Sequence, residues 1–171
     1  MFRAMKRIRI LDFFVQLAVV ITFAWFLVYS FGTRVMGAGA SMAPLLEQNE
    51  LALINRVAYT FHKPRRFDVV AFRTFDGRQN VKRIIGLPGE RVQIQKGVVY
   101  INGEALQEFA QAAMAGLAQE EIVLLDNEYF VLGDNRLNSE DSRFQSIGNI
   151  SGDHIEGKLW LRLFPRFGWI S

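Results

Sequence analysis

The sequence contains no cysteine and only two histidines, His62 and His154. The lack of cysteine excludes disulfides, thiol catalysis and cysteine-bound metals, and two histidines are too few for a histidine-rich metal site. We therefore expect no metal and no cofactor.

The sequence also has no excess of basic over acidic residues outside the N-terminus. The net charge is +3, but the first 31 residues hold four basic residues against one acidic, and the other 140 hold 16 of each. Because no basic face is indicated beyond the N-terminus, nucleic acid is not an expected partner. A chain of 171 residues fits one domain, or a compact core with an insertion.

One long apolar run, Ile10 to Phe31, lies near the N-terminus. As a helix its 22 residues would extend about 33 Å, enough to cross a hydrocarbon core of about 30 Å. This length favours a retained transmembrane anchor at 10–31 over a cleaved signal peptide, although the small residues at 37–40 resemble a cleavage site. The basic residues before the run predict a cytoplasmic N-terminus, residues 1–9, and an extracytoplasmic domain, residues 32–171.

Beyond the span the sequence changes to short segments rich in β-branched and aromatic residues, separated by turn signals. We expect strands at Leu51–Val57, Asp68–Phe72, Val81–Ile85, Arg91–Ile94, Val98–Ile101, Tyr129–Leu132 and Lys158–Phe164. Hairpin or tight turns are expected at Lys96-Gly97 and Asn102-Gly103. The predicted fold class is a mainly β ectodomain of antiparallel sheets with one N-terminal transmembrane helix. Residues 104–121 are alanine-rich and lack β-branched side chains, which predicts a short helix or a mobile insertion.

Ser41 is the candidate nucleophile of the extracytoplasmic part. Two glycines and two alanines at positions 37–40 leave room for another extended chain to approach, and Pro44 restricts Ala43 to extended conformations. These features predict an accessible serine at a rigid bend. A plain linker after a membrane span has a similar composition. The interpretation of Ser41 as a nucleophile therefore depends on the residues that follow.

A serine without a histidine partner can react if a neutral lysine takes its proton. The lysine pKa, ordinarily about 10.4, must then fall to near 7, which burial among apolar groups can achieve. Lys82 is the best candidate, because it lies in the strand-like segment Asn80–Ile85 and would share a face with Ile84 while Arg83 points the other way. A surface lysine on an edge strand would have the same local sequence.

A polar loop, Gly133–Arg143, follows the apolar strand at 129–132. So many hydrogen-bonding groups in one loop predict an internally bonded turn that carries or braces a site, with a solvated loop as the alternative.

These stretches together resemble the type I signal peptidases, membrane-anchored serine proteases that remove signal peptides from exported proteins. The resemblance covers nearly the whole chain and rests on Ser41–Pro44 after a single span, Phe67–Phe72, Lys82–Glu90 and Gly133–Arg143, in that order. It implies a signal-peptidase-like β fold, with Ser41 as the nucleophile and Lys82 as the general base.

The resemblance also implies supporting roles. Ser139 matches a serine that helps to orient the lysine, and Asp141 and Arg143 match a pair that braces the catalytic loop. The Ser41 main-chain N–H would be one donor to the oxyanion. Many members carry a serine as the second donor where this chain has Gly39, so that donor stays unassigned. Leu45 replaces a usual threonine, for which we expect only a packing consequence.

The substrates that the resemblance implies are preproteins whose signal peptides end in small residues at the first and third positions before the cut, an A-x-A-like pattern. An extended peptide should lie along strand edges above shallow apolar pockets. By family position, the residues near these pockets are Gly37, Ala38, Gly39, Met42, Leu46, Asn80 and Val81. The implied surroundings are the lipid bilayer of a bacterial cell membrane, and the small ectodomain with Gly39 favours a Gram-positive-like bacterium.

Other interpretations stay open. Self-cleaving repressor-like Ser/Lys proteases share a serine–methionine motif and a lysine base, but they lack a membrane span and carry a DNA-binding segment. Pilus-assembly accessory proteins on the same scaffold lack the nucleophile or the base. A dedicated enzyme with few substrates is a further option, and residues 110–118 have the composition of a site cut by a neighbouring copy. The C-terminal residues Phe164, Phe167, Trp169 and Ile170 either complete the core or contact lipid.

Overall fold

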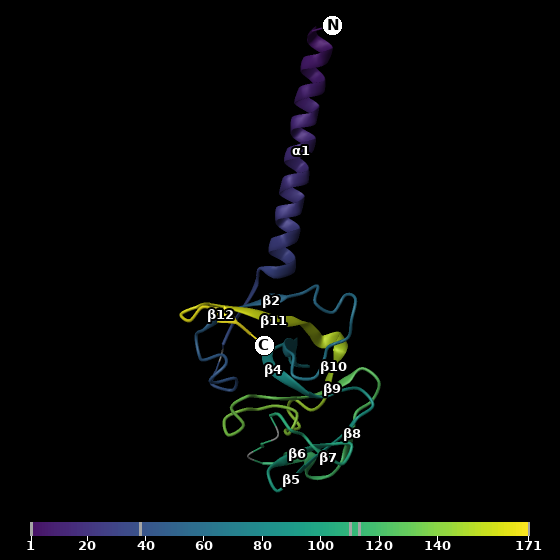
Figure 1. Ribbon diagram of the computed structural model, residues 1–171, viewed down its shortest axis with the longest axis vertical. Helices are drawn as coiled ribbons and strands as arrows, with labels where there is room; N and C mark the ends of the chain where they lie inside the picture. The colour runs from purple at the N-terminus through teal and green to yellow at the C-terminus, as the bar shows by residue number, and fades with distance from the viewer. Residues whose placement is uncertain (1, 38, 110, 113, 171) are drawn as a thin grey trace.

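The computed structural model describes residues 2–37, 39–109, 111–112 and 114–170, with the side chains of the first helix described from Asp12 onward. Helix α1, Phe2–Phe31, projects from a β domain and carries the N-terminus away from it (Figure 1). Its part Asp12–Phe31 is long and apolar enough to cross a membrane. Its large apolar side chains from Phe13 to Tyr29 are exposed, so the protein itself does not bury them.

The predicted fold class is confirmed, because the rest of the chain consists mainly of two antiparallel sheets. The larger sheet has the strand order β1-β2-β11-β3-β4-β9-β10, with β12 paired to β11. Its strands are β1 Thr33–Met36, β2 Leu51–Asn55, β3 Val69–Arg73, β4 Gln79–Gly86, β9 Glu128–Leu132, β10 Ile150–Ser151, β11 Ile155–Phe164 and β12 Gly168–Trp169. Strand β4 lies between β3 and β9 and is therefore an interior strand.

The smaller sheet lies at the end of the domain farthest from α1 (Figure 1). Its order is β7-β6-β5-β8, with bounds β5 Arg91–Gln95, β6 Val98–Ile101, β7 Glu104–Ala105 and β8 Ile122–Val123. The predicted Lys96-Gly97 turn joins β5 to β6 with φ of 48° and 78°, the positive values that such a two-residue hairpin turn requires.

The alanine-rich segment 104–121 forms strand β7 and a 3₁₀ helix, η1 Gly116–Gln119, and its described residues include no α-helix. Ala112 and Ala118 are buried in the core between the two sheets, and the Leu117 N–H donates to the Arg143 carbonyl at 2.9 Å. This part of the segment therefore packs against the domain. A second 3₁₀ helix, η2 Gly152–His154, precedes β11.

All seven predicted strands are present, with ends that differ by a few residues. Strand β11 begins at Ile155, three residues before the prediction, because its pairing with β3 continues through a bulge that the sequence pattern does not show. The sequence did not predict β1, β7, β8, β10 and β12, whose two to four residues each are too few to show a clear alternation.

The domain is coupled to α1 without a flexible spacer. One residue, Gly32, separates α1 from β1. The Arg56 N–H donates to the Ser30 carbonyl at 2.9 Å, and the Trp160 Nε1–H donates to the Phe31 carbonyl at 3.4 Å. These contacts fix β2 and β11 to the end of the helix.

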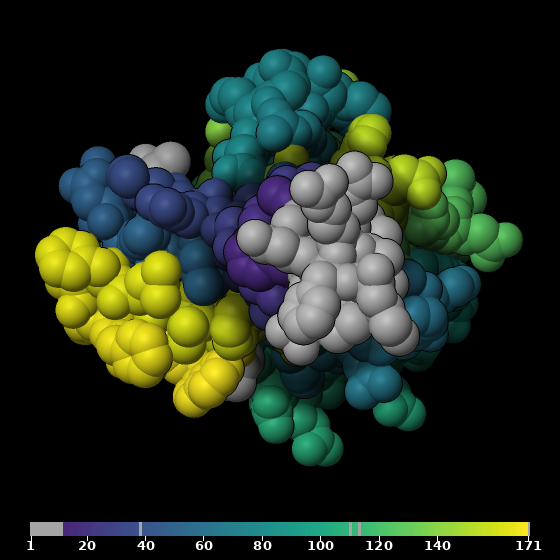
Figure 2. All heavy atoms as spheres, turned by 90° about the horizontal axis from the view of Figure 1, so that it is seen from above, coloured from purple at the N-terminus to yellow at the C-terminus, as the bar shows by residue number. Residues whose placement is uncertain are grey.

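The C-terminal residues divide between core and surface. Ile170 is buried in the same core cluster as Met42, whereas Phe164, Phe167 and Trp169 are 68%, 72% and 73% exposed. Figure 2, which looks down onto the helix, shows the C-terminal segment beside the segment around residue 40, on one side of α1.

Candidate active site

Ser41 sits at the start of a compact turn that is anchored by two buried side chains. Met42 and Leu46 are each 2% exposed and pack on the larger sheet, and the Leu46 N–H donates to the Met42 carbonyl at 2.9 Å. Because the side chains of Met42 and Leu46 both enter the core, the turn that begins at Ser41 has little freedom to move.

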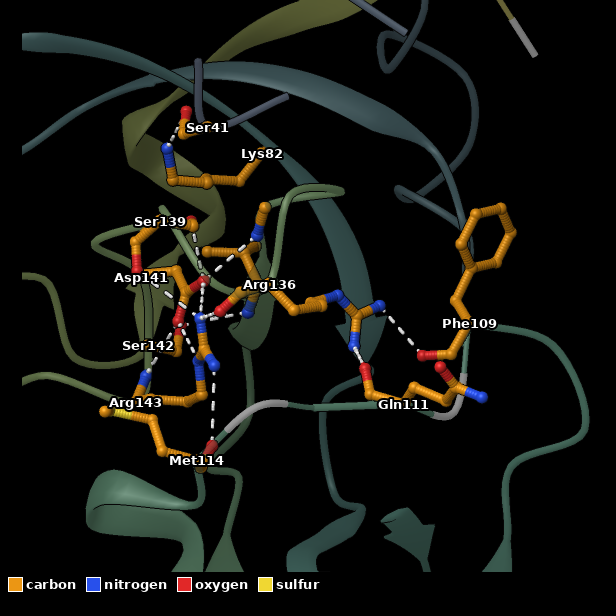
Figure 3. A network of polar contacts seen from close by, with 12 residues as sticks. Ser41, Lys82, Phe109, Gln111, Met114, Arg136, Ser139, Asp141, Ser142 and Arg143 are labelled. Atoms are coloured by element: carbon orange, nitrogen blue, oxygen red, sulfur yellow. Dashed lines mark hydrogen bonds and ion pairs between the residues drawn. The ribbon is translucent and has the colours of Figure 1, made fainter. Parts of the chain in front are cut away.

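Lys82 reaches Ser41 from the interior strand β4. Its side chain is buried, with the residue 3% exposed, and its Nζ lies 2.9 Å from the Ser41 Oγ. Figure 3 shows the amine of Lys82 directed at the hydroxyl of Ser41. The two residues are 41 positions apart in sequence, so the sheet brings them together.

The environment of Lys82 makes its neutral amine more accessible than that of an ordinary lysine. Burial lowers the pKa of Lys82 from 10.5 to about 8, while the carboxylates of Asp141 and Glu140 act in the opposite direction. A protonated Lys82 donates to the Ser41 oxygen. A neutral Lys82 offers a lone pair to the Ser41 hydroxyl instead, which is the arrangement that activates a serine for nucleophilic attack.

The loop Gly133–Arg143 is internally bonded, as predicted, around a buried ion pair. Asp141 and Arg143 side chains are both 0% exposed, with Arg143 Nε 2.7 Å and Nη2 2.9 Å from the Asp141 carboxylate oxygens. Asp141 also accepts from the Gly133 N–H at 3.1 Å, and Arg143 donates to the carbonyls of Arg136 and Ser139. The charges of the pair are thereby compensated and hydrogen-bonded, which a buried pair requires.

Ser139 belongs to this network. Its hydroxyl donates to the Asp141 Oδ2 at 2.7 Å, and within the described part of the chain it makes no hydrogen bond to Lys82. Its predicted role in orienting the lysine therefore stays a prediction. In Figure 3, Ser139 lies between the buried ion pair and the Lys82 side chain.

The same loop also holds the backbone of Ser41, a connection that the sequence did not reveal. The Asn135 N–H donates to the Ser41 carbonyl at 3.0 Å, and the Asn135 side-chain amide donates to the Ala40 carbonyl at 3.1 Å. A Cβ on Gly133 would overlap both the Ser139 hydroxyl and the Ser41 carbonyl. Only glycine fits there, because loop and nucleophile are in direct contact.

Arg83 joins the loop to the strand that carries Lys82. Its Nε and Nη2 each lie 2.8 Å from the Asp134 carboxylate, and its Nη1 donates to the Phe67 carbonyl at 2.8 Å. This fork-to-fork geometry fixes orientation as well as distance. The sequence predicted only that Arg83 points away from the face of Lys82.

A cavity of about 460 Å³ opens over Ser41 and Lys82. Most of the predicted substrate-binding residues line it, namely Gly37, Gly39, Met42, Leu46, Asn80 and Val81. Ala38, the remaining predicted residue, lies outside the described residues. The cavity is also lined by residues that the sequence did not indicate: Val35, Met36, Gln79 and Glu140.

No cluster of three or more potential metal-ligating side chains occurs among the residues that the structure describes. The groups gathered at the site are a hydroxyl, an amine and a braced loop, a set suited to acyl transfer by nucleophilic attack.

Comparison with known proteins identifies the family. The model of the family described as "Signal peptidase, peptidase S26" matches residues 8–164. The chain belongs to this family. The resemblance seen in the sequence is thus confirmed. As a member of the signal peptidase family, the chain is a serine peptidase.

Several signal peptidases are similar over much of the chain. Signal peptidase I of Bacillus caldolyticus is 33% identical over an alignment of 174 positions, which covers 94% of this chain and 92% of the relative. Probable signal peptidase I-2 of Synechocystis is 35% identical over 133 residues, 74% of this chain but only 60% of that relative. A solved signal peptidase I from Enterococcus faecalis is 34% identical, with a TM-score of 0.48 over 57% of this chain and 97% of that chain. Family membership and the apolar N-terminal helix fit a membrane-anchored enzyme.

Proposed function

We propose that the protein is a membrane-anchored endopeptidase that removes N-terminal signal peptides from exported preproteins, with Ser41 as the nucleophile and Lys82 as the general base. The observation that carries the proposal is the 2.9 Å contact between the Ser41 Oγ and the buried Lys82 Nζ, at the floor of an open cavity. Relatives named signal peptidase I support the choice of substrate.

The proposed reaction uses these groups in sequence. Neutral Lys82 accepts the hydroxyl proton as the Ser41 Oγ attacks the scissile carbonyl, and the Ser41 N–H donates to the oxyanion. Lys82 then gives the proton to the leaving amine, which releases the mature protein. Lys82 then takes a proton from a water molecule, whose oxygen attacks the acyl carbon. The bond from this carbon to the Ser41 Oγ breaks, Lys82 returns the proton to the Oγ, and the signal peptide leaves with a new C-terminal carboxylate. The second oxyanion donor has no assigned group in this scheme, because position 39 is glycine.

Asp141 and Arg143 keep the catalytic loop in place in this proposal, and Ser139, which is hydrogen-bonded to Asp141, helps to orient the lysine. The support is the continuous set of contacts from the buried Asp141–Arg143 pair through Gly133 and Asn135 to the Ser41 carbonyl. These residues position the reacting groups without touching the scissile bond.

The walls of the cavity suit small side chains before the cut. Met42 and Leu46 are almost fully buried and form a shallow apolar floor, and Gly37 and Gly39 add no side-chain bulk. Asn80 and Val81 lie at the start of β4, beside Lys82, and pair with β3 on one side. On the other side β9 pairs with β4 at Arg83, Ile84 and Gly86, so the edge of β4 before Arg83 can pair with an extended peptide. We infer that these residues accept the A-x-A-like end of a signal peptide.

We further propose that α1 spans a bacterial cell membrane with its basic N-terminus in the cytoplasm and the β domain outside. A preprotein that is still held in the bilayer by its own signal peptide would then be confined to the same surface as the active site. This confinement raises the effective concentration of the substrate, even where the contacts in the cavity are weak.

The test is cleavage of a preprotein with an A-x-A site by the full chain in detergent. Ser41→Ala and Lys82→Met should each reduce cleavage by at least about 10³-fold while circular dichroism and thermal unfolding show an intact fold. Lys63→Met, at an exposed lysine outside the cavity, is the matched control and should cleave like the wild type. The new N-terminus should follow the second small residue.

Substantial turnover by the Ser41 or Lys82 variant would refute the dyad. If the folded wild-type chain cleaved none of several preproteins, an accessory role or a narrow-substrate enzyme would replace the proposed function.

A further inference from the structure

Glu140 is a carboxylate in the active-site cavity that the proposed mechanism does not use. Its two neighbours, Ser139 and Asp141, are buried beneath the site, but Glu140 itself is exposed and lines the cavity together with Ser41 and Lys82. The loop thus directs alternate side chains inward to the ion pair and outward to the cavity.

The carboxylate of Glu140 is held in place by a hydrogen bond and not by a salt bridge to any described residue. The Ser146 hydroxyl donates to the Glu140 Oε1 at 2.5 Å. Within the described part of the chain, Glu140 forms no salt bridge. One of its oxygens therefore stays available to a ligand, and the cation that it acts on across the cavity is Lys82, whose charged form it favours.

The charges of the cavity are confined to two of its described lining residues, Lys82 and Glu140. Apart from Lys82 and Glu140, every residue that lines it is apolar, amide-bearing, hydroxyl-bearing or glycine. With Lys82 neutral, as catalysis requires, Glu140 supplies the only formal charge among the described lining residues. A substrate side chain that passes this point meets a negative potential that water only partly screens.

We propose that Glu140 makes the enzyme prefer a basic side chain on the substrate residue that directly follows the cut, and disfavour an acidic one. The proposal rests on the proposed function. In that reaction Lys82 hands its proton to the leaving amine, so the leaving residue passes beside Lys82. Glu140 comes from the loop next to Lys82, whereas the apolar walls that receive the residues before the cut come from β1, β4 and the 42–46 turn.

The experiment compares three preproteins that share one A-x-A site and differ only in the first residue after the cut, which is Arg, Gln or Glu. The full chain is assayed in detergent at pH 9.5. At this pH Lys82, with a pKa of about 8, is neutral in most molecules, while a substrate arginine remains charged. The readout is the ratio of kcat/KM for the Arg substrate to that for the Glu substrate.

We expect a ratio of about 10 for the wild type, falling toward 1 in Glu140→Gln and in high salt. Because the readout is a ratio, a uniform change in activity of the variant cancels. Glu120→Gln, at an exposed glutamate outside the cavity, is the matched control and should retain the wild-type ratio.

An equal ratio in the wild type and Glu140→Gln would overturn the proposal. So would an equal fall in Glu120→Gln, which would show that the overall charge of the protein sets the preference. A third contrary result would come from Glu140→Gln: a shifted pH profile with the Gln substrate, but the same Arg-to-Glu ratio of kcat/KM as the wild type. Glu140 would then act on Lys82 alone and not on the substrate. Failure of the proposed function would look different, since the wild type would cleave none of the three preproteins.

Discussion

Replacing Lys82 by methionine should remove activity and at the same time stabilise the fold at neutral pH. Because burial lowers the pKa of Lys82 from 10.5 to about 8, its charged form is less stable in the folded chain than in the unfolded chain. Relative to the neutral form, the difference is about 3 kcal/mol. Between those pH values the unfolded chain binds a proton that the folded chain does not, so the free energy of unfolding rises with pH. Below about pH 8 the folded wild type carries the whole penalty. Methionine is unbranched, of similar length and uncharged, and carries none of it.

The assay is thermal unfolding of the full chain in detergent at pH 7 and pH 10.5. At pH 7, Lys82→Met should unfold on the order of 8 °C above the wild type, since 1 kcal/mol corresponds to roughly 2–4 °C in a domain of this size. The difference should shrink as the pH approaches 10.5. Groups present in both proteins titrate alike and cancel. Lys63→Met is the control, because the Lys63 side chain is exposed and keeps its hydration in the folded state.

A difference in stability that stayed constant from pH 7 to pH 10.5 would refute the reasoning. It would mean that Lys82 is as easily protonated in the folded chain as in the unfolded chain. The kinetics provide a second check, because kcat/KM of the wild type should increase as the pH rises through about 8 and the neutral amine forms.

Three further substitutions test the loop. Asp141→Asn leaves Arg143 buried without its counter-charge, so it should destabilise the domain by about 3–5 kcal/mol, seen as a large fall in Tm, and an unchanged Tm would show that the pair is dispensable. Ser139→Ala removes one hydrogen bond to Asp141 and should lower kcat/KM roughly tenfold without abolishing cleavage, whereas unchanged kinetics would deny it a positioning role. Gly133→Ala forces a methyl group against the Ser41 carbonyl and should lower kcat/KM by at least about 10²-fold, with a cost of only about 1–3 kcal/mol in unfolding free energy; wild-type activity would show that the loop can yield.

The sequence predicted the long apolar helix, the long strands and the two candidate reacting residues because each leaves a local signal. The run 10–31 is apolar throughout, and Lys82 stands in a strand-like apolar segment. The short strands left no such signal. Strand β1, for example, is four residues that follow the apolar run and look like a linker, and it acquires its conformation by pairing with β2.

The hydrogen bonds that hold the site in place could not be predicted from composition, because they join residues that are far apart in the sequence. Asn135 and Ala40 are 95 residues apart, and Arg83 and Asp134 are 51 apart. The polar loop indicated a braced turn, but only the fold determines which backbone each side chain reaches. Glu140 differs from its neighbours in its outward orientation, which depends on the path of the loop and not on its residue type.

A single residue separates α1 from β1, and Arg56 and Trp160 donate hydrogen bonds to the end of the helix. The distance between the helix and the β domain is therefore fixed. If α1 spans a bilayer as proposed, this short hydrogen-bonded joint sets the height of Ser41 above the lipid surface. A cleavage site would then be selected by its distance from the membrane as well as by its side chains. Small residues that lie deeper, within the hydrocarbon, would remain uncut because the hydroxyl cannot descend to them.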